Sequence, residues 1–358
     1  MTSSNLDILI IGAGQAGLAL GYHLRQTSWH FQLVDGHGRI GDSWRNRYAS
    51  LRLFTPRSYS SLPGMELSGD PAGYAGRIEF ADYLEVYARH FALPVVMNTT
   101  IQKLDRANDC FRASTESGQI ITTRSVVLAT GAFQQPIIPA FSKSFSAGTL
   151  QFSPATYRNP GEIPAGVVLV VGDGATGRDI AAELADSHRV LLAAGRSRRL
   201  VPDYILGRSA WWWFDKFGFL RVSPGTPLGR YLRRSDPFPG RGKGLKQLAL
   251  KGVRVMSRLV NVMGRRVTFS DGESAEVDIV IWTTGYRDRS DWVDIPEVKD
   301  AQGQFLQQSG ISSVAGLYFI GRPWQTNRGS ALILGVGADA EDLARKITTH
   351  LQAASVIP

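Results

Sequence analysis

Residues 6–17, LDILIIGAGQAG, consist of a short apolar run followed by three spaced glycines, Gly12, Gly14 and Gly17. The run is rich in β-branched residues, which predicts a buried parallel strand. Good helix formers follow up to residue 24, and a second apolar run, residues 31–34, ends at Asp35. Strand, glycine turn, helix, strand and acid together predict a dinucleotide-binding βαβ unit.

The glycine spacing meets the needs of a pyrophosphate at a helix N-terminus. The first glycine permits a tight turn, the second lets the backbone approach the phosphates, and the third lets the helix pack against the strand. An acid about twenty residues further on accepts a hydrogen bond from a ribose hydroxyl. A glycine motif alone is often only a turn, but here every part of the unit is present. We expect FAD at this site, with contacts from Gly12, Gly14, Gln15, Ala16, Gly17, Asp35 and Gly36.

The same pattern returns in the middle of the chain. Residues 167–171, VVLVV, lead into a second glycine motif, a predicted helix over 178–187 and a strand over 189–194. This strand runs into basic residues instead of an acid, and arginines bind a 2′-phosphate that an acid would repel. The pattern favours NADPH over NADH, although an ordinary basic loop would look the same. The expected contacts are Gly172, Gly174, Ala175, Thr176, Gly177, Arg196, Ser197 and Arg198.

A further pair of similar segments indicates how the two units are joined. SVVLATG, residues 125–131, resembles DIVIWTTG, residues 278–285, and the two end 117 and 111 residues after the middle glycine of their own motif. The sequence therefore predicts an α/β fold of two Rossmann-like domains, with the NADPH domain inserted in the FAD domain. We expect the FAD domain over 1–163 and 285–358 and the NADPH domain over 164–284. The chain should cross from one domain to the other near residues 159–165 and 285–290.

Composition excludes several classes of protein. Among 358 residues there is one cysteine, Cys110, which rules out an intramolecular disulfide, a CxxC redox pair and a cysteine-based zinc site. The six histidines show no metal-binding spacing, so we expect no metal. The N-terminal residues do not resemble a signal peptide and no apolar run is long enough to cross a bilayer. We expect a soluble, cytoplasmic protein.

The net charge of +9 is unevenly distributed. Residues 196–266 hold 17 Lys and Arg against 3 Asp and Glu, so the rest of the chain is acidic overall. Such a block is typical of a nucleic-acid or membrane surface, of a phosphate-rich cofactor site, or of a solvated face. No nucleic-acid-binding motif accompanies it. We expect no nucleic-acid partner, and the role of the Trp211-Trp212-Trp213 segment within this block stays open.

Several further segments resemble the class B flavin monooxygenases, above all the bacterial CzcO-like proteins and, further off, the plant YUCCA enzymes. They include GDSW at 41–44, YASLRLFTP at 48–56, YSSLPG at 59–64, TGYR at 284–287, GLYFIG at 316–321, RGSA at 328–331 and GVGADA at 335–340. The resemblance covers nearly the whole chain. It implies FAD contacts from Gly41, Ser43, Trp44, Arg52 and Leu53, cofactor contacts at Ala129, Thr130, Gly131, Thr284, Gly285 and Gly321, and a place beside the isoalloxazine for Phe54.

One segment departs from this family's pattern. Members usually carry FxGxxxHxxx(Y/F) between the glycine motifs, whereas this chain has Phe145 and Gly148 and then Ser153 and Tyr157. One residue is inserted before the glycine and one after it, and Ser153 replaces the histidine. Phe54 and Ser153 are the candidate catalytic residues, and no acid–base pair is required.

The resemblance implies a reaction in which NADPH reduces FAD and the reduced flavin traps O₂ as a C4a-hydroperoxide. One oxygen atom then passes to a small substrate with a soft nitrogen or sulfur nucleophile or a carbonyl group, and the cofactor supplies the chemistry. Two alternatives stay open. One is an NADPH oxidase or flavin reductase that releases hydrogen peroxide, which is compatible with the altered linker segment. The other is a redox-regulatory flavoprotein without oxygenase activity. A disulfide reductase would need the missing CxxC. The oligomeric state and the substrate stay open.

Overall fold

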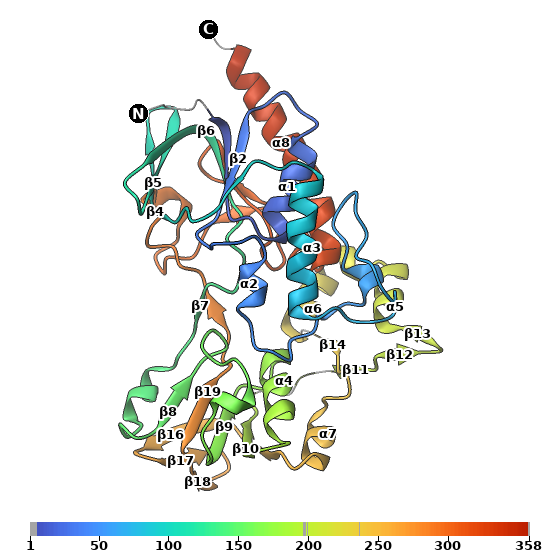
Figure 1. The fold of residues 1–358 in the computed structure, drawn as a ribbon, viewed down its shortest axis with the longest axis vertical. Helices are drawn as coiled ribbons and strands as arrows, with labels where there is room; N and C mark the ends of the chain where they lie inside the picture. Colours follow the sequence, from blue (N-terminus) through green and yellow to red (C-terminus); the bar gives the residue numbers. More distant parts are fainter. Residues whose placement is uncertain (1–5, 196–197, 199, 236, 357–358) are drawn as a thin grey trace.

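The computed structural model describes residues 6–195, 198, 200–235 and 237–356, and it contains two sheets built mainly of parallel strands. Figure 1 shows them as two bodies of the molecule, one above the other, with the chain passing between them around β7 (Gln135–Pro136). The larger body holds both ends of the described chain, and the smaller holds its middle. The predicted α/β class with two Rossmann-like units is confirmed.

The larger sheet has nine strands and is built around the first glycine motif. Its main order is β21-β22-β23-β6-β1-β2-β3, and the β4–β5 hairpin joins it through β6. The strands are β1 (Leu6–Ile11), β2 (Phe31–Val34), β3 (Val95–Val96), β4 (Ile101–Ala107), β5 (Cys110–Thr115), β6 (Ile120–Leu128), β21 (Gln307–Gln308), β22 (Ile311–Ser312) and β23 (Leu317–Phe319). β1 pairs in parallel with both β2 and β6, so the predicted first strand lies at the centre of the sheet.

Both faces of β1 are buried, as an all-apolar central strand requires. Ile8 and Ile10 face a core shared with the helices, whereas Leu9 and Ile11 face a second core beneath the β4–β5 hairpin. Figure 1 shows α1, α3 and α8 together beside the sheet. The helical elements of this body are α1 (Gln15–Leu24), α2 (Asp42–Arg45), α3 (Arg77–His90) and α8 (Ile333–Val356), with short 3₁₀ turns η1 (Arg57–Tyr59) and η5 (Pro296–Val298).

The smaller body repeats this plan around the second glycine motif. Its five-stranded sheet has the order β15-β10-β9-β19-β8, and a three-stranded antiparallel sheet, β16-β17-β18, packs against it. The strands are β8 (Leu150–Phe152), β9 (Val167–Val171), β10 (Arg189–Ala193), β15 (Arg254–Met256), β16 (Leu259–Met263), β17 (Arg266–Phe269), β18 (Ser274–Glu276) and β19 (Ile279–Trp282). The helical elements are α4 (Ala175–Leu184), α7 (Leu245–Leu250), η2 (Ala140–Ser144) and η3 (Pro160–Glu162).

The predicted boundary at residues 163 and 164 does not agree with the strand pairing. β8, which precedes that boundary, pairs in parallel with β19 and so lies in the smaller sheet. The chain crosses earlier, where β7 pairs with β20 (Tyr286–Arg287) in a two-stranded antiparallel link. β8 is only three residues long, and its partner lies more than a hundred residues away, so local sequence gave no sign of the pairing. We therefore propose that the inserted domain begins just after β7, while the second crossing at β20 stays as predicted.

Between β10 and β15 the smaller body carries an insert of short elements. They are β11 (Leu200–Val201), β12 (Tyr204–Ile205), β13 (Arg208–Ser209), β14 (Phe238–Pro239), α5 (Ala210–Lys216), η4 (Phe219–Arg221) and α6 (Pro227–Ser235). Figure 1 shows the β12–β13 hairpin projecting away from both bodies beside α5. The insert returns to the larger body through backbone hydrogen bonds from Arg328 N–H to Val222 O and from Gly329 N–H to Leu220 O.

Candidate functional site

The first glycine turn is shaped by close backbone contacts. A Cβ at Gly17 would lie 2.0 Å from the Gly12 carbonyl oxygen, and one at Gly12 would lie 2.5 Å from the Ala129 carbonyl oxygen. Gly12 also adopts a φ of +113°, which a side chain rarely permits. Both positions therefore need glycine for the fold itself.

Gly14 differs from the other two glycines, because a Cβ there would meet nothing within 4 Å. Gly14 is the N-cap of α1, and no side chain caps the helix. Amide N–H groups at an uncapped helix N-terminus attract anions. An open position in front of these groups fits the diphosphate of a dinucleotide, so the residues here suit the predicted FAD.

Asp35 is held beside this turn at the end of β2. One carboxylate oxygen accepts from the Ala13 N–H at 2.8 Å, and the other accepts from the His37 backbone at 2.9 Å and pairs with its ring at 2.7 Å. Burial opposes ionisation of Asp35, but these hydrogen bonds outweigh it and lower its pKa. The hydrogen bond to Asp35 raises the pKa of His37 against the effect of burial. Asp35 is thus an ionised acceptor at the position predicted for a ribose hydroxyl. Gly36, the next residue predicted to contact FAD, lies against Thr100, since a Cβ at Gly36 would be 2.7 Å from Thr100 Oγ1.

Residues far apart in sequence converge on the first turn. Trp44 on α2 donates from Nε1 to Gln15 Oε1 at 3.2 Å, and Gly321 lies so close that its Cβ would be 2.8 Å from the Ala16 methyl group. Gly41, with a φ of +88°, is the N-cap of α2, which also carries Ser43. The structure therefore brings together the predicted residues around the Gly12–Gly17 turn, namely Gln15, Ala16, Trp44, Ala129 and Gly321.

Other predicted FAD contacts lie on the neighbouring loops. Leu53 is buried and its N–H donates to Ala75 O at 2.8 Å, whereas Arg52 donates to Tyr74 O at 3.1 Å. Thr130 and Gly131 follow Ala129 directly, and both accept hydrogen bonds from the side chain of Gln134. These contacts hold the loops in place, and the structure gives Thr130 and Gly131 no hydrogen bond to the first turn.

The start of α8 approaches the same region. A Cβ at Gly335 would lie 2.3 Å from the Gly329 carbonyl oxygen, so this loop and helix touch through their backbones. The loop is fixed by Asp339, a buried carboxyl that accepts from the Thr326 hydroxyl. Burial raises the pKa of Asp339. Asp339 was not predicted as a site residue, since it looks like any acid on a helix.

The second glycine turn reproduces the first with different partners. A Cβ at Gly177 would lie 1.9 Å from the Gly172 carbonyl oxygen, and one at Gly172 would lie 2.5 Å from Thr283 O. The Thr283 hydroxyl donates to Gly172 O at 2.8 Å, a contact that sequence analysis did not single out. Gly174 is the N-cap of α4 without a side-chain cap, so this helix offers the same anion site at its first residues, Ala175 and Thr176.

Basic residues lie at this second turn. Arg198 Nη2 would be 3.8 Å from a Cβ at Gly174, which places a guanidinium beside the open face of the turn. Asp173, buried within the turn, pairs with Arg178 at 3.0 Å and with Arg198 at 3.5 Å. Arg196 and Ser197, the other predicted contacts with a 2′-phosphate, lie outside the described residues.

Thr284 and Gly285 make their hydrogen bonds to Ile137. Thr284 donates to Ile137 O, and Gly285 O accepts from the Ile137 N–H at 2.9 Å, so both residues form part of the link between the two bodies. Thr283, one residue earlier, is the residue that reaches Gly172.

The two candidate catalytic residues occupy different surroundings. The Phe54 ring lies in an aromatic cluster with Phe238 at 5.5 Å and Trp211 at 6.3 Å between ring centroids, and the Arg241 guanidinium lies 5.1 Å from its centroid. Ser153 lies just after β8, and its hydrogen bonds all go to its own turn, including one from the Ala155 N–H to Ser153 Oγ at 3.2 Å. Among the described residues, the hydrogen-bond partners of Ser153 and the ring contacts of Phe54 have no residue in common.

A buried ion cluster joins the second turn to the larger body. Asp179 on α4 accepts from the Tyr48 hydroxyl at 3.1 Å and from Arg241 Nη2 at 2.9 and 2.7 Å, and it also pairs with Lys243. Burial and the Asp179 charge raise the pKa of Tyr48 well above its usual value. Asp179 is only 4% exposed, so its charge requires these partners.

Arg241 extends the cluster to the segment before Phe54. Its Nη1 donates to the carbonyl oxygens of Arg52 and Leu53 at 3.3 and 3.4 Å, while its N–H donates to Asp203 at 2.7 Å. Its own φ of +48° is unusual for a residue with a side chain. Arg241 thereby connects the helix of the second glycine turn with the residues next to the aromatic cluster. In the sequence, the one indication of this cluster is an acid, Asp179, among the apolar residues of α4.

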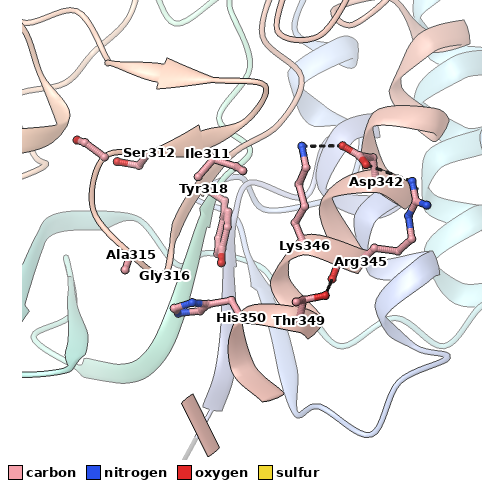
Figure 2. Close-up of a pocket in the computed structure, with 11 residues that line it drawn as sticks. Ile311, Ser312, Ala315, Gly316, Tyr318, Asp342, Arg345, Lys346, Thr349 and His350 are labelled. Carbon is pink, nitrogen blue, oxygen red and sulfur yellow. Dashed lines mark hydrogen bonds and ion pairs between the residues drawn. The ribbon is translucent and has the colours of Figure 1, made fainter. Parts of the chain in front are cut away.

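A separate hollow of about 660 Å³ lies between the β22–β23 loop and the end of α8, and Figure 2 shows its lining. Asp342 pairs there with Arg345 at 3.1 Å and Lys346 at 2.8 Å, and the ring of His350 lies near that of Tyr318. Neither glycine turn contributes to its lining, so we assign this hollow no part in nucleotide binding.

Comparison with known proteins identifies relatives along the whole chain. Residues 9–203 match the model of the pyridine nucleotide-disulphide oxidoreductase family. A CzcO-like oxidoreductase of Geobacillus kaustophilus is 46% identical over 96% of this chain and 99% of its own. A probable indole-3-pyruvate monooxygenase of Arabidopsis thaliana, YUCCA7, is 25% identical over 95% of this chain and 86% of its own. The solved structure of a flavin-containing monooxygenase from Stenotrophomonas maltophilia superposes with a TM-score of 0.81 at 24% identity, covering 97% of this chain and 99% of that one.

Two alanine substitutions in the first turn should have opposite consequences. Gly14→Ala places a methyl group in open space, so the folded protein should keep its melting temperature while FAD affinity falls roughly 10-fold or more. Gly17→Ala forces a methyl group against the Gly12 carbonyl and should destabilise the fold by about 1–3 kcal/mol. Flavin titration and thermal unfolding of the flavin-free protein measure both effects. Unaltered FAD affinity in Gly14→Ala would contradict the assigned site.

Removing the Asp179 carboxylate should cost far more stability than removing a neighbouring surface contact. Asp179→Asn leaves Arg241 and Lys243 without their counter-ion, which should lower the free energy of unfolding by about 3–5 kcal/mol. Ser50→Ala, which removes the exposed hydrogen bond to Glu183, should cost at most about 1 kcal/mol. Urea unfolding of the two variants measures both decreases in the free energy of unfolding. Equal decreases would show that the cluster does not hold the two bodies together.

Proposed function

Because the chain belongs to the pyridine nucleotide-disulphide oxidoreductase family, and within it to the class B flavin monooxygenases, we propose that it oxygenates a small substrate with FAD and NADPH. The chain is a flavin-dependent oxidoreductase, and FAD and NADPH are its cofactors. The single observation that carries the proposal is the pair of uncapped helix N-termini, each behind a glycine turn and one on each body. Two nucleotides are needed to move a hydride between them, and the chain has a separate site for each.

The residues divide into two binding roles. Gly14 and the first turn of α1 would hold the FAD diphosphate, with Asp35 accepting from the ribose. Gly174 and the first turn of α4 would hold the NADPH diphosphate, with Arg198 beside it for the 2′-phosphate. Arg196 and Ser197 belong to the same proposal by their place in the sequence. When bound, the flavin supplies hydride acceptance and oxygen activation, chemistry that no side chain provides.

The protein's own contribution is then position and the exclusion of water. Phe54, Phe238 and Trp211 form an apolar wall at the contact between the two bodies. The Asp179–Arg241 pair fixes α4 relative to the segment that carries Phe54. Such packing shelters reactive species from water. Proton transfers in the proposed reaction need no dedicated side chain at this wall, because the cofactor supplies the chemistry.

The substrate class follows from the family chemistry. We propose a small molecule with a soft nitrogen or sulfur nucleophile or a carbonyl group, with O₂ as co-substrate. The YUCCA7 relative is named for oxygenating a keto acid, indole-3-pyruvate, which keeps the carbonyl class within the proposal.

One observation favours a second candidate function. Ser153 stands where the family usually has a histidine, and its hydroxyl is engaged within its own turn. An enzyme that shelters the reduced flavin less well would release hydrogen peroxide as an NADPH oxidase.

The ratio of peroxide to NADPH separates the two functions. The purified protein should show a flavin absorbance spectrum, oxidise NADPH faster than NADH, and release less than one peroxide per NADPH when an amine, sulfide or ketone substrate is present. Oxygen consumption and peroxide assays across such a panel measure this. One peroxide for every NADPH with all substrates would establish the oxidase, and a protein that cannot bind added FAD would refute both functions.

The basic residues of the second turn should discriminate between the two nicotinamide cofactors. Arg198→Ala and Arg196→Ala should each raise KM for NADPH by roughly 10-fold and leave KM for NADH nearly unchanged, since only NADPH has the 2′-phosphate. Arg254→Ala provides the control, because this exposed arginine on β15 pairs with Glu273 on the surface. Equal effects on both cofactors would contradict a phosphate-binding role.

A further inference from the structure

The insert exposes large apolar side chains at its outer end. Leu206 is 87% exposed, Phe217 is 65% exposed and Tyr204 is 55% exposed. Leu206 lies at the tip of the β12–β13 hairpin, and Phe217 directly follows α5. Figure 1 shows this hairpin as a projection beside α5. An exposed apolar group of this kind usually marks a binding surface.

Contacts within the insert hold these residues as one unit. Trp213 donates from Nε1 to Ile205 O in the hairpin at 2.8 Å. The Phe217 ring stacks on Trp213, with centroids 5.6 Å apart and planes at 13°. The Arg208 guanidinium lies 5.3 Å from the ring centroid of Trp212. Hairpin and helix therefore form a connected surface, which we call the hairpin–α5 surface: Tyr204, Leu206, Arg208, Lys216, Phe217 and Arg221.

The tip residue is costly for the fold. Leu206 has a φ of +48° and Gly207 a φ of +73°, so two successive left-handed residues make the turn. Turns of this type favour Asn-Gly or Gly-Gly, because a side chain at the first position is strained. Leu206 is neither buried nor in a favoured conformation, so the folded chain gains nothing from it. An apolar side chain kept at such a position indicates a contact made outside the chain.

The charges around this surface point to the chemistry of the partner. Residues 204–221, which include the whole surface, contain three Lys and Arg against one acid, Asp215. Asp215 pairs with Arg221 at 3.0 Å, whereas Arg208 and Lys216 are exposed beside the apolar residues. A second copy of the same surface would bring like charges together. The partner is therefore anionic, and it must also accept apolar groups.

We propose that the hairpin–α5 surface docks on a membrane that contains anionic phospholipid. Aromatic and aliphatic side chains insert at the level of the headgroups, and lysine and arginine contact the lipid phosphates. The surface lies on the membrane and does not cross it, since no helix in the described part of the chain has the length and apolar composition of a membrane span. Nucleic acid is also anionic, but a phosphate backbone offers no site for Leu206 and Phe217.

Vesicle binding by the intact flavoprotein tests the proposal. The protein should co-sediment with phosphatidylglycerol vesicles, bind phosphatidylcholine vesicles much more weakly, and dissociate as salt is raised. Leu206→Asp should weaken binding roughly 10-fold or more, since it removes one buried leucine side chain. Lys216→Ala should weaken it roughly 5-fold. Leu250→Asp is the matched control, because Leu250 is 89% exposed on α7, outside this surface.

A second variant separates docking from folding. Leu206→Gly relieves the strained turn and should raise the melting temperature while weakening binding to phosphatidylglycerol vesicles. A loss of binding together with greater stability cannot come from misfolding. Equal weakening by Leu206→Asp and Leu250→Asp would overturn the proposal. So would a sedimentation-velocity dimer that Leu206→Asp dissociates while vesicle binding is unchanged, or binding to duplex DNA in place of vesicles.

Discussion

The fold depends on how closely a helix approaches the strand before it. At Gly17 and at Gly177 the helix backbone is so near the preceding turn that a methyl group would lie within about 2 Å of a carbonyl oxygen. Each helix begins directly at the turn without a side-chain cap, and its first N–H groups face open space at Gly14 and the Arg198 guanidinium at Gly174. A single packing constraint thus produces both the architecture and the anion site, and the chain uses it once in each body.

A hydride can pass between the two nucleotides only when the two bodies bring their binding sites together. The connecting strands β7 and β20 are two residues each, too short to set that relation alone. Asp179 adds a buried carboxylate that takes hydrogen bonds from Tyr48 of the larger body and from Arg241 of the insert. A buried charge of this kind is costly when a partner is missing, so losing any one partner destabilises the arrangement. The insert is therefore part of the contact between the two bodies as well as an addition to the surface.

Sequence patterns predicted what is local. The two glycine motifs, their flanking strands and Asp35 lie within one βαβ unit each, so spacing alone was enough to find them. β8 precedes the predicted first crossing but joins the smaller sheet through β19, a pairing that is set by tertiary contacts. Arg241 was missed for the same reason, since its partners at 52–53, 179 and 203 come from three distant segments. The family resemblance implied cofactor contacts at Thr284 and Gly285; in the structure Thr284 donates to Ile137 O, and the preceding Thr283 donates to Gly172 O in the second turn.

The altered linker segment lies at the contact between the two bodies. Ser153 begins a turn that ends at Tyr157, whose N–H donates to Ser153 O at 2.8 Å. The buried Tyr157 hydroxyl donates to Glu183 on α4 at 3.0 Å, and Ser50 of the larger body donates to the same carboxylate at 2.8 Å. The turn thus supports α4 at the point where it meets the larger body. The side chain of Ser153 contributes to this turn by accepting from the Ala155 N–H at 3.2 Å. Under the proposed function, a reactive flavin is protected only while water is excluded, so this turn would bear on the choice between oxygen transfer and peroxide release.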